Sequence, residues 1–311
     1  MKPTMNDTAK TVTGVLPVFQ TPFHPDESID FETLAREIDW LFNEGSDGIV
    51  LAMVSEVLRL SDQERQSLTE KSCELANGRG AAIISVGAES SRLAETFAKQ
   101  AESAGATALM AIPPVATGAT SDELAGYYER LFKAVKIPIV VQDASGYVGL
   151  PMSIEFQAGL LDSFGPERVW FKPEAVPIGP RLSALRDATG SKARIFEGTG
   201  GISLVDSHQR GVCGTMPGAD LIRGIVPLWQ ALEKGNMSRA SRIHGPLSSL
   251  ISLQTSLDGF LAVEKHLLVR QGIFTNELVR GPRGFVIDDE TRNEVDRLFD
   301  LMIEATLEND A

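Results

Sequence analysis

Lys172 ends a short apolar run that begins at Val169 and contains two aromatic residues, Trp170 and Phe171. The length of this run and its β-branched and aromatic residues are typical of a buried strand. A lysine amine in water is almost always protonated at neutral pH, whereas partial burial favours the neutral amine that can attack a carbonyl carbon. Lys172 is therefore a candidate nucleophile for imine formation. Snorkelling to solvent or pairing with Glu174 is the alternative explanation.

Other polar residues follow apolar runs in the same way, and they could surround such an amine. They supply hydroxyl, amide and carboxylate groups and exposed backbone N–H donors, which is the inventory that imine chemistry needs. A glycine-rich segment, residues 198–201, precedes an expected helix and could bind an anion, although glycines more commonly serve tight turns. The candidates for substrate contact at these positions are Ser55, Gln142, Asp143, Gly198, Thr199 and Thr215.

The elements that must position these groups alternate along the chain. Short apolar runs, which predict buried parallel strands, are each followed by an amphipathic stretch with helical spacing. Eight such pairs close most economically as a (β/α)₈ TIM barrel, which needs about 250 residues. The expected strands are 13–18, 48–52, 81–86, 107–111, 137–142, 169–172, 193–197 and 211–216, and the expected helices are 31–43, 62–77, 90–104, 121–135, 152–163, 177–189, 203–210 and 220–234.

A C-terminal helical extension follows the expected barrel. We assign residues 1–235 to the barrel and residues 236–311 to a helical region, with helices over 238–255, 259–271 and 289–307. Glycine and proline residues within 275–287 predict a surface loop. A helical tail of this size cannot bury its apolar residues alone, so we expect it to pack on the barrel or on a neighbouring subunit.

Composition limits the classes of partner. The 311 residues contain 29 basic and 42 acidic residues, for a net charge of −13, which would repel a nucleic acid backbone. No apolar stretch is long enough to cross a membrane. The two cysteines do not form a pair of motif spacing, and the four histidines have no metal-ligand spacing. We expect a cytoplasmic protein with a small-molecule substrate, without a metal or a cofactor.

The chain resembles the dihydrodipicolinate synthase and N-acetylneuraminate lyase superfamily over nearly its whole length. The residues that carry the resemblance are 14–18, 21–23, Ser55-Glu56, 60–65, Lys172 and 264–266. The resemblance implies that Lys172 forms an imine with a 2-keto acid and that the backbone at Val54 and Ser55 binds the substrate carboxylate. It also places Gly198 and Thr199 at the far part of the pocket. Members of the superfamily commonly form dimers or tetramers, so a homo-oligomer is expected.

Several family features are missing from this sequence. The Gly-Thr-Thr-Gly-Glu loop reads Ala-Met-Val-Ser-Glu at residues 52–56, and Gln142 replaces the tyrosine that relays protons after the fifth strand. Residues 113–115 read Pro-Pro-Val in place of Pro-Tyr-Tyr, and the arginine that binds a second substrate's carboxylate in dihydrodipicolinate synthases falls on Tyr147. These losses argue against condensation with an amino-aldehyde acid.

Another branch of the superfamily fits the sequence better. Residues 141–144, 171–174 and 55–56 resemble the 2-keto-3-deoxy-L-arabonate dehydratases, in which glutamine occupies the tyrosine position and a glutamate lies two residues after the lysine. The likeness implies that Glu174 transfers the proton and that Gln142 binds substrate hydroxyls. The leading hypothesis is an imine-forming hydro-lyase of a 2-keto-3-deoxy sugar acid.

Three alternatives remain open from the sequence. The protein could be an aldolase that releases pyruvate, or a dihydrodipicolinate synthase. It could also be a relative that binds keto acids without turning them over. Structural explanations also exist for Glu174, as an ion-pair partner, for Gln142, as a satisfied core amide, and for Ser55, as a turn cap.

Overall fold

The computed structural model describes residues 12–116, 118–146 and 149–307. Within them, eight parallel strands follow the order β1-β8-β7-β6-β5-β4-β3-β2. Backbone hydrogen bonds at Val50 close the sheet into a barrel: Val50 N–H donates to Pro17 O (2.9 Å) and Phe19 N–H donates to Val50 O (3.2 Å). The predicted TIM barrel is confirmed. The strands are β1 (Gly14–Val15), β2 (Gly48–Leu51), β3 (Ala81–Ser85), β4 (Ala108–Ala111), β5 (Ile139–Asp143), β6 (Val169–Pro173), β7 (Arg194–Glu197) and β8 (Gly214–Thr215).

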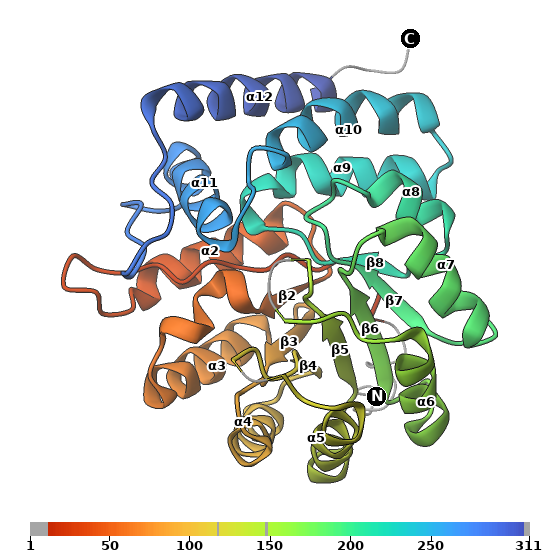
Figure 1. Ribbon diagram of the computed structural model, residues 1–311. Coiled ribbons are helices and arrows are strands. Elements are labelled where there is room, and N and C mark those ends of the chain that lie inside the picture. The colour runs from red at the N-terminus through yellow and green to blue at the C-terminus, as the bar shows by residue number, and fades with distance from the viewer. Residues whose placement is uncertain (1–11, 117, 147–148, 308–311) are drawn as a thin grey trace.

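Helices surround the strands and cover the outside of the barrel (Figure 1). Side-chain caps fix several of their starts: Asp30 accepts from two backbone N–H groups at the start of α2, and Ser61 and Glu64 form a reciprocal capping box at α3, an arrangement that satisfies otherwise unpaired amides. The helices of the barrel are α2 (Phe31–Asn43), α3 (Asp62–Ala76), α4 (Ser91–Ser103), α5 (Ser121–Ala134), α6 (Ile154–Phe164), α7 (Ile178–Ala188), α8 (Leu204–Gln209) and α9 (Ile222–Glu233).

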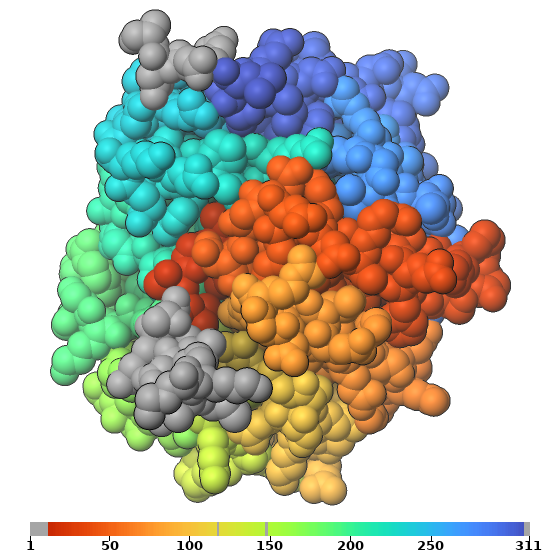
Figure 2. Space-filling model, turned by 180° about the vertical axis from the view of Figure 1, so that it is seen from behind, coloured from red at the N-terminus to blue at the C-terminus, as the bar shows by residue number. Residues whose placement is uncertain are grey.

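The C-terminal helices pack on one side of the ring. Helices α10 (Met237–Ile251) and α12 (Asp289–Leu307) pack against each other and against α9, and α11 (Leu257–Arg270) contacts the short helix η3 (Ala219–Leu221) that follows β8. From the opposite side, the N-terminal segment coloured red and orange lies between the teal and blue C-terminal helices and the yellow α4–α5 region (Figure 2). The expected boundary at residue 235 and the expected dimer or tetramer stay predictions.

The core has two parts on the two faces of the sheet. Side chains alternate along each strand, so every second residue points into the barrel. The interior layer includes Val140 on β5, Trp170 on β6 and Phe196 on β7, and the rings of Trp170 and Phe196 lie 5.9 Å apart. Gln142 and Lys172 each come two residues later on the same face, so the apolar interior forms the floor beneath them.

The structure differs from the sequence prediction mainly at element ends. Strands β1 and β8 are shorter than expected, and α10 ends at Ile251 and not at residue 255. Residues 252–256 therefore form a loop, and Ser256 caps α11 by accepting from Gly259 N–H (3.1 Å). Residues 275–287 lack helix and strand, as predicted. None of the helices within the described residues is long and apolar enough to span a membrane.

Candidate active site

A cavity of about 560 Å³ opens at the carboxyl ends of the strands. In barrels of this type, the reacting groups lie at that end. The cavity lining comes from the strand ends and loops and from the C-terminal helices. Six of the residues predicted from sequence line it: Val54, Gln142, Lys172, Glu174, Gly198 and Thr199.

Lys172, Glu174 and Gln142 form a connected group in the floor of this cavity. Lys172 Nζ lies 2.8 Å from Glu174 Oε1, and Gln142 Nε2 donates to Glu174 Oε2 at 2.9 Å. The β5–β6 register places Gln142 beside Lys172. All three side chains are buried. The carboxylate thus holds the amine with one oxygen and the amide with the other.

Gly198 allows this group to form. A Cβ atom at residue 198 would lie 2.7 Å from Glu174 Oε1 and 2.9 Å from Lys172 Cε. Both distances are far below normal carbon contact distances of about 3.5–4.0 Å. The glycine at the end of β7 therefore provides room for the lysine and the glutamate to lie side by side.

Glu197, which the sequence analysis did not single out as a site residue, organises the wall beyond Gly198. Its Oε1 accepts from the backbone N–H of Thr199 (2.7 Å) and from the Thr199 hydroxyl, and its Oε2 accepts from Thr215 Oγ1 at 2.7 Å. Thr215 is fully buried and does not line the cavity. The β7 carboxylate thus ties the loop after its own strand to β8.

Ser55 and Asp143 lie near the cavity, but their polar groups bind the protein itself. Ser55 Oγ donates to Phe19 O (2.5 Å) and accepts from Ala52 N–H (3.1 Å), so it holds the turn after β2. Asp143 accepts from the Ser145 hydroxyl (2.6 Å) and from Met152 N–H (3.0 Å). Neither side chain lines the cavity, whereas Val54 does.

The two described tyrosines also bind backbone groups. Tyr127 OH donates to Ile112 O (3.2 Å), and Tyr128 OH donates to Ala111 O (3.1 Å), both at the end of β4. Burial raises the pKa of Tyr127 to about 12. Among the described residues no phenol lines the cavity. Tyr147, the position of the family arginine, lies outside the described residues.

Sequence reasoning missed the opposite side of the cavity. Asp220 in η3, Gln254 in the loop before α11 and Glu264 on α11 all line it, and we call these three residues the acidic wall. Burial raises the pKa of Asp220 to about 7 and the pKa of Glu264 well above its ordinary value. Glu264 lies in residues 264–266, which carried the family resemblance and were the available signal, whereas Asp220 resembled an ordinary first-turn carboxylate.

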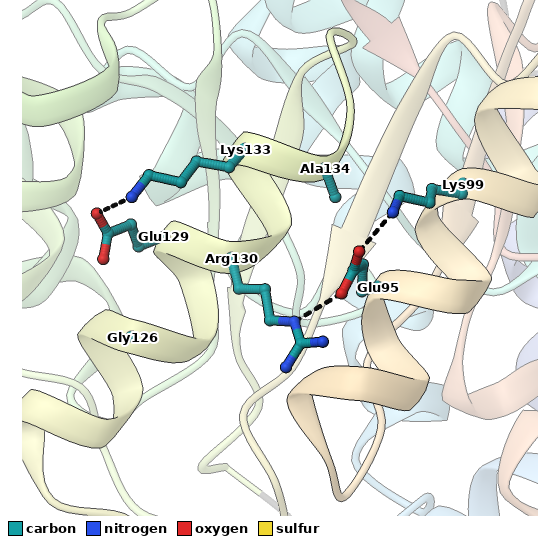
Figure 3. Close-up of a pocket in the computed structure, with 7 residues that line it drawn as sticks. All are labelled: Glu95, Lys99, Gly126, Glu129, Arg130, Lys133 and Ala134. Carbon is teal, nitrogen blue, oxygen red and sulfur yellow. Dashed lines mark hydrogen bonds and ion pairs between the residues drawn. The ribbon is translucent and has the colours of Figure 1, made fainter.

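A second hollow, of about 400 Å³, lies on the outside of the barrel between α4 and α5 (Figure 3). Its charged side chains bind each other: Glu95 pairs with both Lys99 and Arg130, and Lys133 pairs with Glu129 at 2.6 Å. Apart from the half-buried Glu95 these groups are exposed, and such pairs are typical of a helix surface. The strand-end cavity, and not this hollow, therefore carries the reactive side chains.

Residues 11–301 match the dihydrodipicolinate synthetase family. The chain belongs to this family. Dihydrodipicolinate synthetase family members are class I lyases, so the protein is a lyase of this type. The predicted resemblance is confirmed.

Curated relatives in the dihydrodipicolinate synthetase family divide between two activities. The chain is 29% identical over 275 residues to L-2-keto-3-deoxyarabonate dehydratase of Azospirillum brasilense, which covers 86% of this chain and 88% of the relative. It is 28% identical over 185 residues to 4-hydroxy-tetrahydrodipicolinate synthase of Rhizobium meliloti strain 1021, which covers 59% of this chain and 58% of the relative.

Solved structures of the family share the fold. The crystal structure of dihydrodipicolinate synthase from Rhodopseudomonas palustris superimposes with a TM-score of 0.85 at 24% identity, over 97% of this chain and 99% of that one. A prophage protein of the family from E. coli K12, solved in complex with pyruvate, has a TM-score of 0.85 at 21% identity, over 94% of this chain and 99% of that one.

Proposed function

We propose that the protein is a hydro-lyase that dehydrates a 2-keto-3-deoxy sugar acid of the 2-keto-3-deoxy-L-arabonate type through an imine on Lys172. The observation that carries this proposal is the position of Glu174: one carboxylate oxygen lies 2.8 Å from Lys172 Nζ inside the cavity. The long match to the Azospirillum brasilense dehydratase supports it. Gln142 at the position of the family's proton-relaying tyrosine also favours a carboxylate as the proton-transfer group.

Imine formation requires a neutral amine. Transfer of a proton from the Lys172 ammonium to Glu174 provides it, because the two groups are already hydrogen-bonded. The amine then attacks the C2 carbonyl carbon of the substrate. Glu174 returns its proton to the hydroxyl of the carbinolamine, which departs as water and leaves the protonated imine.

Dehydration uses the same carboxylate. The positive imine nitrogen makes the C3–H bond acidic, and Glu174 removes that proton to form the enamine. The enamine expels the C4 hydroxyl, which leaves as water with the proton from Glu174. A proton then moves from C5 to C3, which leaves an enol across C4 and C5. The enol loses its hydroxyl proton and gains one at C4 to become the aldehyde, and hydrolysis of the imine releases 2-oxoglutarate semialdehyde and restores Lys172.

The surrounding residues position the reacting groups. Gln142 holds the second oxygen of Glu174 and so orients the carboxylate. We assign the substrate carboxylate to the backbone at Val54 and the substrate contacts of the β7 loop to Gly198 and Thr199, which line the cavity. We assign Ser55, Asp143 and Thr215 to positioning of the strand-end loops, because their side chains bind protein groups.

Borohydride trapping combined with product analysis tests this function. With pyruvate and borohydride, the wild-type protein should gain one covalent adduct at Lys172, and Lys172→Ala should gain none. Glu174→Gln should still be trapped, although more slowly, but should lose at least about 10²-fold in dehydration rate. Glu129→Gln, in the hollow between α4 and α5, is the control and should behave as the wild type.

The products distinguish the related activities. Appearance of 2-oxoglutarate semialdehyde from 2-keto-3-deoxy-L-arabonate supports the dehydratase, whereas release of pyruvate and an aldehyde would identify an aldolase. Condensation of pyruvate with an amino-aldehyde acid would identify a dihydrodipicolinate synthase. A trapped adduct without turnover of any of these acids would identify a keto-acid-binding relative.

A further inference from the structure

The acidic wall faces the same cavity as Lys172 and Glu174, but none of the steps above uses it. Asp220 and Glu264 converge beside Gly218: a Cβ atom at residue 218 would lie 2.5 Å from Glu264 Oε1 and 2.7 Å from Asp220 Oδ1. The two carboxyl oxygens are therefore within about 5 Å of each other. Gly218 thus provides room for one pair of polar side chains, just as Gly198 does for Lys172 and Glu174.

No cation among the described residues forms an ion pair with either carboxyl group. Lys265 is the nearby ammonium, and its Nζ already donates to Thr21 O (2.9 Å), Leu278 O (2.6 Å) and Glu56 Oε1 (2.5 Å). A third buried carboxyl, Glu37 on α2, lies near enough to raise the pKa of Glu264 further. Two neighbouring carboxyls in such a place cannot both ionise easily, so burial and proximity favour the protonated form of the pair.

Unsatisfied hydrogen-bonding atoms in the wall indicate what the pair could bind. Glu264 Oε2 accepts from Gln20 Nε2. Asp220 Oδ2 has no hydrogen-bond partner among the described residues, and neither has Gln254 Nε2. Gln254 is 7% exposed and lines the cavity from the loop before α11, independently of the acidic pair. A buried amide donor and a buried carboxylate acceptor without partners need a ligand or water that can both accept and donate.

An alcohol hydroxyl has that property. Its oxygen accepts from an amide N–H or from a protonated carboxyl, and its O–H donates to a carboxylate. A carboxylate or phosphate group on the ligand would instead meet the negative charge of the pair. The wall therefore favours neutral polyhydroxy chains over ligands with a second anionic group.

We propose that the acidic wall is a subsite for the hydroxyl groups at the far end of the 2-keto acid that reacts with Lys172. This inference rests on the proposed imine chemistry and adds the substrate class that the cavity selects. The keto end of the substrate binds at β5–β6, and the hydroxylated end binds between η3 and α11. The C-terminal helices thereby supply the discrimination between hydroxylated and plain 2-keto acids.

Competing keto acids in borohydride trapping test the subsite without requiring turnover. The probes are 4,5-dihydroxy-2-oxopentanoate, 2-oxopentanoate, which has the same chain without hydroxyls, and 2-oxoglutarate, which has a terminal carboxylate. Every adduct on Lys172 is counted by intact mass. The wild-type protein should be half-modified by the dihydroxy acid at a concentration at least about tenfold below that for 2-oxopentanoate, and 2-oxoglutarate should be the poorest of the three.

Variants of the acidic wall test whether its residues cause the preference for the dihydroxy acid. Asp220→Asn and Gln254→Leu should each reduce the preference for the dihydroxy acid about tenfold and leave trapping of 2-oxopentanoate unchanged. A purely structural role would weaken trapping of both acids equally. Asp47→Asn is the control for the change of a carboxylate to an amide, since Asp47 is exposed, accepts from Val15 N–H (2.8 Å) and does not line the cavity.

Two different failures are distinguishable. Equal trapping of the dihydroxy acid and 2-oxopentanoate by the wild-type protein, or an unchanged preference in both wall variants, would overturn the subsite alone. The absence of any adduct from the wild-type protein would overturn the imine chemistry and the subsite together. A clear preference without semialdehyde formation would retain the subsite and overturn the hydro-lyase.

Discussion

Gly198 lies so close to Glu174 that a methyl group on its Cα would be 2.7 Å from the carboxylate oxygen that holds Lys172. The close packing of this glycine, at the end of β7, sets the separation of the two groups proposed to react. A side chain there would displace the amine, the carboxylate or both.

Gly198→Ala should reduce kcat/KM for dehydration by about 10²-fold, because a displacement near 1 Å in a reacting group costs about that much. Global stability should change little by comparison, since the two side chains that the methyl group displaces, Lys172 and Glu174, line the cavity. Steady-state kinetics and thermal unfolding measure the two effects. Gly159→Ala is the control: residue 159 lies in α6 with open space around its Cα, so this change should keep activity and stabilise the helix slightly. Unchanged kinetics in Gly198→Ala would contradict the packing argument.

Gln142→Met should lower kcat about 10-fold to 100-fold, because Glu174 Oε2 loses the amide donor at 2.9 Å and the carboxylate is no longer held in one orientation. Trapping of pyruvate by borohydride should be affected much less, since Lys172 keeps its contact with Glu174 Oε1. Comparison of kcat with the trapping rate distinguishes a role of Gln142 in orienting the Glu174 carboxylate from a role in forming the imine. A proportional loss of both would show that Gln142 acts on imine formation itself.

The Glu64–Arg280 pair should make stability depend on acidic pH. Hydrogen bonding from Arg280 lowers the pKa of Glu64 from 4.5 to about 2 in the folded protein. A lowered pKa means that the stabilisation is complete above the unfolded-state value and is lost as the pH falls through about 2. The difference in unfolding free energy between the wild type and Glu64→Gln should therefore be largest near neutral pH. It should disappear as the pH falls through about 2.

Urea unfolding at several pH values measures this difference. Glutamine can still form the capping box with Ser61 at the start of α3, so the substitution isolates the charge. A difference that stays constant down to pH 2 would mean that the pair with Arg280 does not contribute.

Lys265→Met should destabilise the fold by about 3 kcal/mol, since the buried Glu56 loses the closer of its two cations and keeps only Arg59, whose Nη1 lies 3.7 Å from Oε2. Both side chains are fully buried, and Lys265 also joins α11 to the backbone at Thr21 and Leu278. The double variant Glu56→Gln/Lys265→Met should lose less than the sum of the single variants, because no unpaired charge remains. Urea unfolding of the wild type, the two single variants and the double variant measures the coupling energy between Glu56 and Lys265. If the two single losses simply add up to the loss in the double variant, the two residues are not coupled.

The fold was largely predictable from the sequence, because a parallel barrel repeats the pattern of a short apolar strand followed by an amphipathic helix eight times. Helix α2 was predicted with its observed bounds, where Asp30 supplies a side-chain cap. Strand β8 was expected over 211–216 but covers only Gly214–Thr215, since Gly211 adopts a left-handed conformation that belongs to the preceding turn.

The candidate site was predictable only in part. Lys172, Glu174 and Gln142 come from adjacent strands, so their position at strand ends predicted that they would meet. The acidic wall depends on the end of α10 at Ile251, which places Gln254 in a loop, and on the packing of α11 over η3. The packing of α11 on η3 is a contact between segments far apart in the chain, which local spacing does not record.

The two ends of the cavity come from separate stretches of the chain: the amine and its carboxylate lie on β6 and just after it, while Gln254 and Glu264 lie beyond residue 250. Mutations in the loop before α11 and on α11 can therefore change which acid is accepted without altering the strand that carries the nucleophile. Under the proposed function, a barrel shortened after α9 would keep Lys172 and Asp220 but lose Gln254 and Glu264. Substitutions in the C-terminal segment would then be a route by which substrate choice changes while the strand that carries the nucleophile stays the same.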